Sequence, residues 1–480
     1  MTNNRAIFSK IGTFFFITII LISSFQVFAL QNKLLIDRQF ISKPINNLLD
    51  DSYDLLIIAP TKFTPYLQPL VDHKNKYGIK TKLVDDEEVY QQIYWTGSDD
   101  AENIKYFIKE AYENWEIKYV LLVGGRKDQS KEETWWIPVR YSYLDRNYST
   151  RIENKFLCDL YFADIYDSEG NFSSWDDNEN GIFGEWIENG PAVDFPDLHP
   201  DVFVGRLPCR NEYEVKTIVN KIINYETGSF SDSWFKNIVA IAGDTYPKKT
   251  DYIDGEVYTQ EGLSYMSDFE HVKIWVSNGE LKNWIDIVIP INRGCGFVWF
   301  SGHGGPHLWG THPYNDSKTW IDIKLRHFTL LINRNKLPVC LSASGCFNNM
   351  FNVSLGHTDW VYSSYGVKYN IPRCWGWTLV RKSNGGSIAT IASTAFSYES
   401  SDIDSGVGGC ERLDIHFFEQ YGENDIDILG ECWGKAVDAF LDNQNINWAD
   451  PSNTGDALIV KNVEQWLLIG DPSLKIGGYN

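Results

Sequence analysis

The feature that most constrains the fold is a series of short apolar runs that end in small residues and alternate with amphipathic stretches. The first run covers 54–60 (DLLIIAP), and a helical pattern over 66–77 separates it from a second run at 79–84. Another helical pattern over 101–115 precedes a glycine-ended run at 119–125 (YVLLVGG). Such runs are typical of strands that are buried on both faces and joined by crossover helices. The sequence therefore predicts an α/β fold with a mostly parallel sheet.

The same pattern returns in the second half of the chain. A strand is predicted from Asp201 and a helix over 212–225, and further buried strands are predicted for the runs that begin at Asn237, Cys295, Leu337 and Gly386. The stretch 135–199 differs because it is rich in Tyr, Trp, Asp, Asn and Gly and has no long apolar run. We interpret it as an elaborated loop region inside the first α/β unit.

Length and composition agree with a folded body of this kind. The chain has 480 residues, of which 43% are apolar and 15% aromatic, and this excludes wholesale disorder. After a short leader at 30–50, the pattern predicts an N-terminal α/β subdomain over 51–230 and a C-terminal α/β subdomain over 231–480, which carries the His and Cys motifs described below. With 43 basic against 64 acidic residues the net charge is −21, so nucleic acid is not an expected partner.

Residues 1–29 have the features of a secretory signal peptide. The first ten residues are basic, 11–22 are almost wholly apolar (IGTFFFITIILI), and 27–29 (VFA) form a small-x-small cleavage site. The mature protein is then expected to begin near Leu30, outside the cytoplasm or in the cell envelope, with no membrane contact after removal of the signal. The alternative is an uncleaved anchor helix, since about 18 apolar residues can just span a bilayer.

One predicted strand ends in a glycine-rich segment that carries a histidine. In FVWFSGHGG (297–305), His303 lies between glycines, which let the backbone turn sharply and approach a substrate. Active sites of open α/β sheets lie beyond the carboxyl ends of their strands. A histidine at such a position can serve as a general base near neutral pH. The plainer interpretation is a histidine that caps a turn.

The next predicted strand ends in small residues followed by a cysteine. In LPVCLSASGC (337–346), the small residues leave Cys346 uncrowded, and nearby amides can form an oxyanion hole. A cysteine thiolate needs a neighbouring base, which His303 can supply if the two strands are neighbours. The chain has eight cysteines and no CxxC pair, which disfavours a thiolate zinc site and leaves some disulfides possible.

A third motif points to calcium. In WDDNENGIFGEW (175–186), oxygen-bearing side chains alternate at Asp176, Asn178 and Asn180, a glycine follows, and Glu185 comes later. Alternating oxygen ligands before a glycine are typical of calcium loops. Glu185 falls at the tenth position of the loop, so this is not a regular EF-hand. The alternative is an acidic, solvated turn.

Taken together, these segments resemble the gingipain family of cysteine peptidases, relatives of caspases and legumains. The resemblance extends from about Asp54 to Leu474 and includes YVLLVGG, DLYFAD, DVFVGRLPCRNEYEV, SGHGG, SASGC, GGSIATIAST and LLIGDPSLKI. It implies a caspase-like (gingipain-type) three-layer α/β sandwich with mostly parallel sheets in two subdomains. It also implies a secreted cysteine-type endopeptidase whose partners are protein or peptide substrates.

The resemblance implies roles for particular residues. His303 and Cys346 match the catalytic dyad, and the N–H groups of Gly304 and Cys346 match the oxyanion hole. Cysteine would attack the peptide carbonyl and form a thioester, histidine would protonate the leaving amine, and water would release the acyl product.

Acidic residues are implicated by the same comparison. Asp244 is the acid nearest to the segment that orients the catalytic histidine in gingipains. Asp254 and Glu256 lie where Arg-specific members carry the acid that reads the P1 side chain, and Glu256 is the closer match. This motivates the hypothesis of a basic (Arg or Lys) P1 preference.

Two other functions remain open at this stage. A metal hydrolase would use His303, His307 and His312, although these lie in a Gly- and Pro-rich loop rather than on one helical face. A catalytically silent surface-binding protein would have kept the fold alone, and the presence of both His303 and Cys346 argues against it. The sequence does not fix the oligomeric state.

Overall fold

The computed structural model describes residues 52–92, 95–144, 146–148, 151–153, 155–187, 189–228, 233–249, 251–356, 370–399, 409–451 and 455–479. The predicted signal peptide (1–29) and leader (30–50) lie outside these residues. From Ser52 onward the chain groups into one compact unit. No helix in the described part of the chain has the length and apolar character that a membrane crossing requires.

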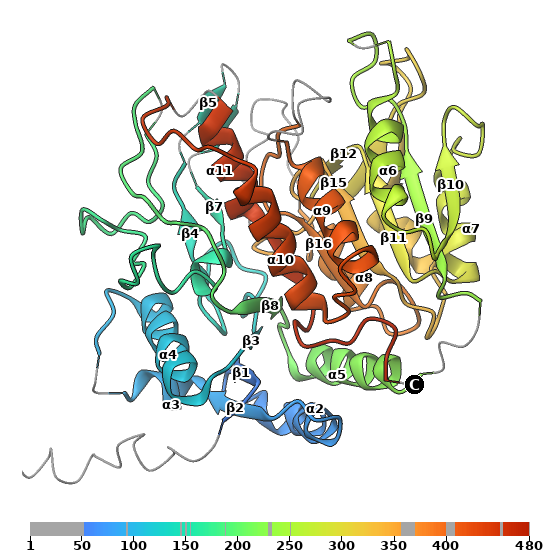
Figure 1. Ribbon diagram of the computed structural model, residues 1–480. Coiled ribbons are helices and arrows are strands. Elements are labelled where there is room, and N and C mark those ends of the chain that lie inside the picture. Colours follow the sequence, from blue (N-terminus) through green and yellow to red (C-terminus); the bar gives the residue numbers. More distant parts are fainter. Residues whose placement is uncertain are drawn as a thin grey trace, which may run out of the picture. The chain divides into compact units, whose positions relative to one another are not determined.

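The centre of the fold is a ten-stranded sheet with the order β10-β9-β11-β15-β16-β17-β8-β3-β1-β2 (Figure 1). The strands are β1 (Leu55–Ala59), β2 (Thr81–Asp85), β3 (Tyr119–Val123), β8 (Phe203–Leu207), β9 (Asn237–Ala242), β10 (Glu270–Trp275), β11 (Phe297–Ser301), β15 (Val339–Ala343), β16 (Ala389–Ser393) and β17 (Trp466–Ile469). All neighbours are parallel except β16 and β17, which pair antiparallel. The prediction of a mostly parallel sheet is confirmed.

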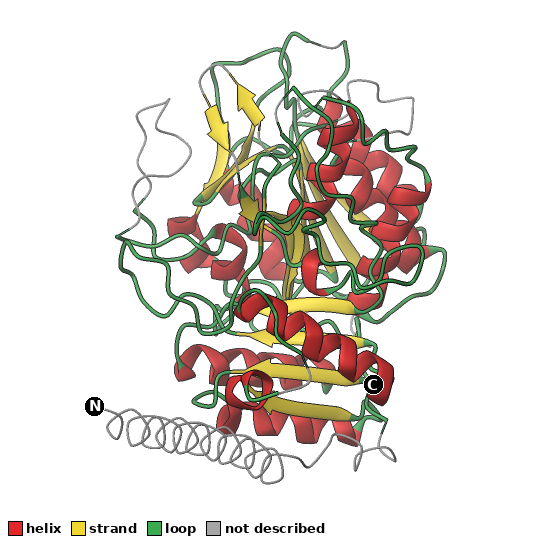
Figure 2. Ribbon diagram, turned by 90° about the vertical axis from the view of Figure 1, so that its left-hand side faces the viewer, coloured by secondary structure: helices red, strands yellow, loops and turns green. Residues whose placement is uncertain are grey.

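Helices lie on both sides of this sheet (Figure 2). They are α2 (Thr64–Lys76), α3 (Asp86–Tyr90), α4 (Asp100–Trp115), α5 (Glu212–Glu226), α6 (Asp254–Ser264), α7 (Trp284–Arg293), α8 (Trp375–Val380), α9 (Glu411–Gly422), α10 (Leu429–Asp442) and α11 (Gly455–Gln465). Polar caps fix where several of them begin. Asp99 and Asn211, for example, accept hydrogen bonds from backbone N–H groups in the first turns of α4 and α5. The predicted helices at 66–77, 101–115 and 212–225 correspond to α2, α4 and α5.

The stretch 135–199 contains short elements. They are β4 (Tyr141–Ser142), β5 (Arg146–Tyr148), β6 (Arg151–Glu153), β7 (Phe156–Leu157) and the 3-10 helix η2 (Leu160–Phe162). Aromatic side chains, rather than the face of a long sheet, form the buried core of this stretch. Tyr161, Trp175 and Trp186 are almost fully buried. Large aromatic rings supply apolar contact area without a long strand.

The four long strands that precede residue 230 lie together at one end of the sheet. The C-terminal strand β17 joins them to the other strands, because it pairs antiparallel with β16 and contacts β8 through the single register pair Ile469–Arg206. The apolar patterns did not predict that the last strand, β17, lies between β16 and β8. The division into two subdomains at residue 230 stays a prediction.

Candidate active site

Three neighbouring strands deliver their following loops to one edge of the sheet. β11 lies between β9 and β15, and its last residue, Ser301, is level with Ala242 on one side and Ala343 on the other. Because the three strands are parallel, the segments that begin at Gly243, Gly302 and Ser344 leave the sheet together. The strands that precede the His303 and Cys346 segments are therefore neighbours in the sheet, as the sequence analysis required for the two residues to meet.

His303 is held in one orientation by a backbone carbonyl. It starts the short strand β12 (His303–Gly305), and its Nε2 lies 2.8 Å from the carbonyl oxygen of Thr245. A carbonyl oxygen only accepts, so Nε2 carries the hydrogen, and in the neutral ring Nδ1 is then the acceptor. Tyr246 and Trp320 flank the ring, with centroid distances of 5.5 Å each. The local backbone thus selects the tautomer that can take a proton at Nδ1.

Gly304 brings the histidine segment against the cysteine turn. A Cβ atom added at Gly304 would lie 2.7 Å from the backbone nitrogen of Cys346 and 2.5 Å from the carbonyl carbon of Gly345. Real Cβ contacts are not that short, so glycine is required at this position if the two segments are to touch. The structure therefore brings together the segments that carry His303, Gly304 and Cys346.

Cys346 differs from the other cysteines in its exposure. All eight are described, all are free thiols, and every one except Cys346 is buried. The disulfides that an exported protein allows are thus absent from this structure. Burial of the sulfur raises the pKa of the Cys346 thiol, and hydrogen bonds from Ser397 act in the opposite direction. Cys346 is the cysteine that can meet a substrate.

The turn that carries Cys346 has an unusual backbone. Ser344 and Phe347 adopt left-handed conformations with φ of 58° and 63°. Such conformations cost about 1–3 kcal/mol each in residues other than glycine and occur preferentially at functional sites. The N–H of Cys346 donates to the carbonyl of Ser344 at 3.0 Å. This N–H, which the resemblance assigns to an oxyanion hole, is thus engaged inside its own turn.

Asp244 lies near this edge, and its backbone and side chain contact the 312–315 segment. Its backbone pairs with that of His312, and its carboxylate accepts a hydrogen bond of 2.9 Å from the N–H of Asn315. The ring of His303 is instead contacted by the carbonyl of the next residue, Thr245. The orienting role of Asp244 stays a prediction, and the backbone carbonyl of Thr245 accepts a hydrogen bond from the His303 ring.

Asp254 and Glu256 have different surroundings although both lie in the first turn of α6. Asp254 accepts a hydrogen bond of 2.8 Å from the N–H of Thr245, which places its carboxylate beside the loop that holds His303. Glu256 accepts from the N–H of Ser277, after β10, and lines an open hollow of about 360 Å³ together with Trp275. Asp254, rather than the closer sequence match Glu256, thus lies beside the loop that contacts His303.

A further acid, Glu399, lies in this neighbourhood and was missed by the sequence analysis. Burial raises the pKa of its carboxyl well above the ordinary range, with added repulsion from Asp254 and Glu411 and an opposing hydrogen bond from Ser344. Burial, together with the charge of Asp244, also raises the pKa of Asp254. Glu399 lies in a polar run (SYES, 397–400), and no pattern in that segment marks it as a functional residue.

These carboxyl groups leave hydrogen-bonding capacity unused. Among the described residues, one buried oxygen each of Asp244, Asp254 and Glu399 has no hydrogen-bond partner. Buried carboxylate oxygens without partners are costly, and a cation that reached them would remove the cost. Because Glu399 contacts Ser344, the cluster adjoins the turn that carries Cys346.

The predicted calcium residues are brought into one loop. Asp176 accepts hydrogen bonds from the N–H groups of Asn180 (2.9 Å) and Gly181 (2.8 Å), and Asn178 accepts from Asn180 at 3.0 Å. The side-chain amide of Asn180 donates to Glu185 at 2.8 Å. All the side-chain oxygens proposed from the sequence therefore face a single turn.

A second acid, Asp194, closes this loop and was not identified from the sequence. It accepts hydrogen bonds from the N–H groups of Asp177 (2.8 Å) and Glu185 (2.7 Å). Burial raises its pKa to about 6, and the negative charges of Asp177 and Asp176 contribute in the same direction. Negative charge and oxygen ligands are what Ca²⁺ prefers, and this loop supplies both, but no three of its described acidic side chains converge on one point.

The three histidines of the metal-hydrolase alternative are not arranged as a metal site. The Nδ1 of His312 contacts the carbonyl of Thr319 at 2.7 Å, and the pKa of His307 is lowered to about 4 by burial and by Lys324. In the described ranges, which contain all three histidines, no group of three or more His, Cys, Asp or Glu residues is placed to hold a metal ion.

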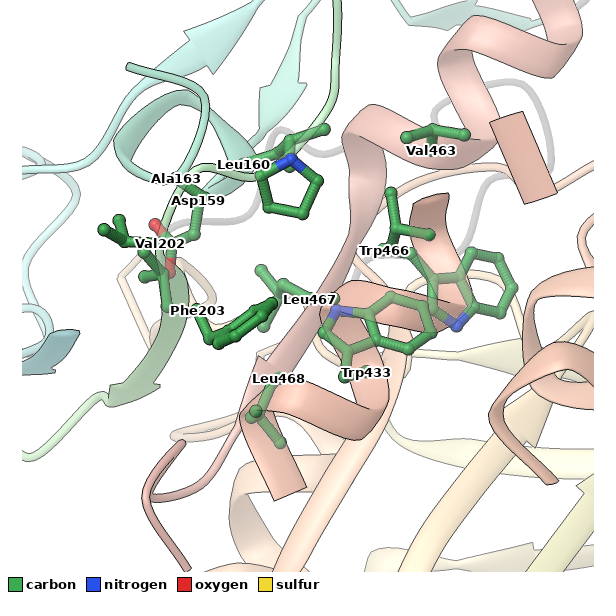
Figure 3. Close-up of a pocket in the computed structure, with 15 residues that line it drawn as sticks. Asp159, Leu160, Ala163, Val202, Phe203, Trp433, Val463, Trp466, Leu467 and Leu468 are labelled. Atoms are coloured by element: carbon green, nitrogen blue, oxygen red, sulfur yellow. The ribbon is translucent and has the colours of Figure 1, made fainter. Parts of the chain in front are cut away.

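A separate apolar pocket lies away from these loops (Figure 3). Side chains of β8, α10, α11 and β17 line it, including Phe203, Trp433, Val463 and Leu468. None of the predicted catalytic or calcium residues is among its lining residues.

Comparisons with known proteins agree on one family. The family model for peptidase family C25 matches residues 48–477. Gingipain R2 of Porphyromonas gingivalis is 21% identical over 430 residues, which covers 88% of this chain and 46% of that protein. The chain thus spans less than half the length of this relative.

Solved structures show the same fold. The crystal structure of the Arg-specific cysteine proteinase gingipain R (RgpB) superposes with a TM-score of 0.57 at 20% identity, covering 91% of this chain and 79% of that one. The complex of the pro- and mature domains of Porphyromonas gingivalis RgpB gives a TM-score of 0.56 at 20% identity, covering 88% and 79%. The expected gingipain-type α/β fold is confirmed.

Proposed function

The chain belongs to peptidase family C25, and we propose that it is a cysteine-type endopeptidase in which Cys346 is the nucleophile and His303 the general base and acid. The observation that carries the proposal is the contact of Gly304 with the Cys346 turn, which joins the histidine and cysteine segments at one sheet edge. The fold without catalysis is the second candidate, and no observation favours it.

In the proposed mechanism, His303 works through Nδ1. Its Nε2–H stays on the carbonyl of Thr245, which supports a fixed ring orientation. Nδ1 accepts the proton of the Cys346 thiol, and the resulting thiolate attacks the peptide carbonyl. The imidazolium then protonates the leaving amine, and water attacks the thioester to release the acyl product.

The oxyanion of the tetrahedral intermediate requires N–H donors. Gly304 and Cys346 are proposed for this role, in keeping with the family resemblance. Because the Cys346 N–H donates to Ser344 in this structure, its participation requires that the turn exchange this hydrogen bond for one to substrate. The left-handed Ser344 supports such an exchange, since strained backbone of this kind occurs preferentially at active sites and switch regions.

We further propose that the P1 side chain is basic and that Asp254 and Glu399 receive it. Both have a buried carboxylate oxygen without a hydrogen-bond partner among the described residues, and burial together with neighbouring negative charge raises the pKa of each carboxyl. A guanidinium or ammonium group would supply the balancing positive charge. Glu256 is the less favoured candidate because its carboxylate is directed to Ser277.

Neutralising these carboxylates is expected to change P1 specificity. We expect Asp254→Asn or Glu399→Gln to lower kcat/KM for Arg and Lys substrates by roughly 10²-fold, because loss of one partner of a desolvated ion pair costs about 2–5 kcal/mol. Glu256→Gln is the matched control and should have little effect. Peptides that differ only at P1 provide the measurement. A large loss in Glu256→Gln with none in Asp254→Asn would assign the pocket to Glu256.

The carboxyl groups of Asp254 and Glu399 are also expected to make the KM for Arg substrates depend on pH. Their pKa values are raised, so they bind protons at a higher pH than ordinary carboxyls do. Protonation removes the charge that attracts a cationic P1 group, so KM for Arg substrates should rise as the pH falls, while KM for neutral P1 substrates should not.

We propose that the loop formed by Asp176, Asn178, Asn180 and Glu185 binds Ca²⁺. The ion would tie the loop together and lower the repulsion that raises the pKa of Asp194. Its role is structural, and the catalytic steps do not depend on it.

Calcium is expected to stabilise the protein. At a Ca²⁺ concentration of about 100 times Kd, the free energy of unfolding should rise by about 2.7 kcal/mol, seen as a melting temperature higher by a few degrees. Asp176→Ala should abolish the shift. Asp167→Ala is the control, since Asp167 caps a neighbouring turn by itself. An equal shift in both variants would place the ion elsewhere.

Secretion and protein substrates complete the proposal. Residues 1–29 have the pattern of a signal peptide, and the partners expected for a peptidase are proteins or peptides. Expression of residues 30–480 and assay against peptides with Arg, Lys, Asp, Asn or apolar P1 residues tests the activity. Failure to cleave any of these peptides, in a natively folded protein, would favour the non-catalytic alternative.

A further inference from the structure

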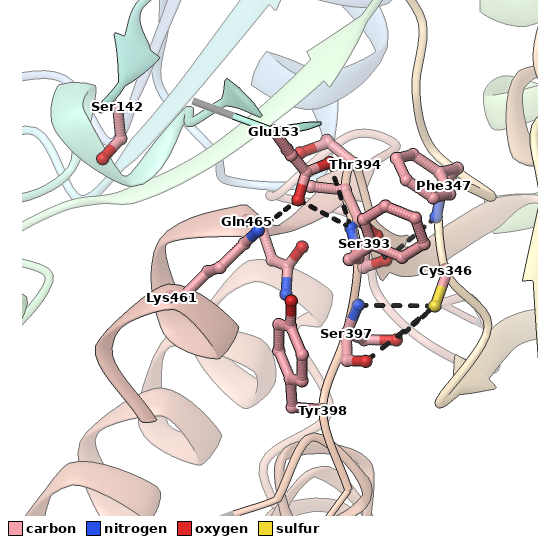
Figure 4. A network of polar contacts seen from close by, with 12 residues as sticks. Ser142, Glu153, Cys346, Phe347, Ser393, Thr394, Ser397, Tyr398, Lys461 and Gln465 are labelled. Carbon is pink, nitrogen blue, oxygen red and sulfur yellow. Dashed lines mark hydrogen bonds and ion pairs between the residues drawn. The ribbon is translucent and has the colours of Figure 1, made fainter. Parts of the chain in front are cut away.

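The segment that follows β16 passes directly beside the proposed nucleophile (Figure 4). The N–H of Ser397 lies 3.4 Å from the sulfur of Cys346, and the Ser397 Oγ lies 3.2 Å from it. One residue thus presents two possible donors to the reacting atom. Donors stabilise a thiolate more than a thiol, because hydrogen bonds to an ionised acceptor are the stronger ones.

A buried ion pair holds this segment on one side. Glu153 of β6 pairs with Lys461 of α11, and both side chains are almost fully buried. The Glu153 carboxylate also accepts the N–H of Phe396, at 3.3 Å from each of its oxygens. Figure 4 shows this pair above and to the left of the Ser397–Cys346 contact. The residue before Ser397 is therefore fixed from β6 and α11.

A side-chain amide fixes the residue that follows Ser397. Asn462 of α11 accepts the N–H of Tyr398 at 3.0 Å and donates to the Tyr398 carbonyl at 2.7 Å. With both neighbours held, Ser397 keeps its place against Cys346 without help from substrate. Such preorganised donors act without a cost of reorganisation when charge develops.

The hydrogen of the Ser397 hydroxyl has two possible acceptors. Besides the sulfur, Oγ lies 3.1 Å from the carbonyl oxygen of Ser344. While Cys346 is a thiol, its S–H can donate to Oγ as the hydroxyl donates to Ser344. When the thiol proton passes to Nδ1 of His303, the hydroxyl turns and donates to the sulfur. One proton moves to the histidine and no other bond is broken.

We propose that Ser397 is a further catalytic residue, whose N–H and hydroxyl stabilise the thiolate of Cys346, and that Glu153 and Asn462 are positioning residues for it. This inference rests on the proposed nucleophile, though not on which peptide is cleaved. Other groups around the sulfur set the background against which Ser397 acts. They are Glu153, Lys461, Tyr246 and Cys410. His303 lies on the segment whose Gly304 contacts the backbone of the Cys346 turn.

The test is the pH dependence of alkylation of Cys346 by iodoacetamide, followed by peptide mapping. The other cysteines are buried, so the reaction reports on this thiol. In Ser397→Ala the midpoint should move up by about one pH unit, and the rate below the midpoint should fall about tenfold. Ser397→Thr keeps the hydroxyl and should retain the midpoint of the unaltered chain. Ser387→Ala, at a buried serine before β16, is the control and should also retain the alkylation midpoint of the unaltered chain.

An unchanged midpoint in natively folded Ser397→Ala would overturn the inference. If that variant does not fold, Asn462→Ala serves instead, since it frees Tyr398 and should also shift the midpoint upward; no shift there would equally overturn it. Alkylation requires no peptide substrate. A chain that cleaves no peptide yet shows the shift would therefore disprove the proposed function and leave the role of Ser397 standing.

Discussion

Replacement of Cys346 by alanine is expected to reduce kcat by about 10⁶-fold, to the limit of detection. The reason is that the acyl-enzyme cannot form without the sulfur, and removal of the nucleophile in comparable hydrolases has an effect of that size. The substitution should leave the fold intact, because the residue is at the surface end of its turn and only one atom is lost. Hydrolysis of a fluorogenic peptide, with circular dichroism as the check on folding, provides the measurement.

A second cysteine provides the matched control. Cys295 is fully buried just before β11, and Cys295→Ala should keep the activity of the unaltered chain, with a lower melting temperature at most. Equal activity of Cys346→Ala and Cys295→Ala would mean that Cys346 is not the nucleophile.

Replacement of His303 by alanine is expected to lower kcat by about 10²–10⁴-fold, the usual contribution of general acid–base catalysis. Nδ1 is required twice, first to take the thiol proton and then to protonate the leaving amine. KM should change little, because neither function concerns ground-state binding. Steady-state kinetics on one peptide would separate the two constants.

His199 offers a histidine outside the site for comparison. It forms an ion pair with Asp438, and His199→Ala should leave kcat unchanged. If His303→Ala instead raised KM and kept kcat, the histidine would be a binding residue and another base would be needed.

The catalytic edge of the sheet could be predicted because its signals are local. Each of the two strands is an unbroken apolar run, and the sequence changes abruptly to glycine and serine where the strand ends, at Gly302 and Ser344. Parallel strands bring such ends to one edge, so the proximity of His303 and Cys346 follows once the strands are neighbours. Gly304 belongs to the same glycine-rich segment, and its lack of a side chain allows the close contact with the Cys346 turn.

Other parts of the site could not be predicted because their contacts are tertiary or involve the backbone. The partner of His303 is the carbonyl of Thr245, and a carbonyl group is the same in every residue. Ser397 and Glu399 lie about fifty residues after Cys346 in a segment that reads as a polar loop, and only the pairing of β15 with β16 brings them back to it. The position and direction of β17 could not be predicted either. It lies between β16 and β8 and runs antiparallel to β16, and no local sequence pattern indicates this placement.

The measurement that tests the central claim most directly is covalent labelling with a peptidyl acyloxymethyl ketone that carries Arg at P1. The ketone needs an activated thiolate and a substrate-like fit, so it examines nucleophile and pocket together. We expect complete inactivation with one adduct per chain, located on Cys346 by peptide mapping. Inactivation with Cys346 unmodified, or an adduct on another residue, would contradict it.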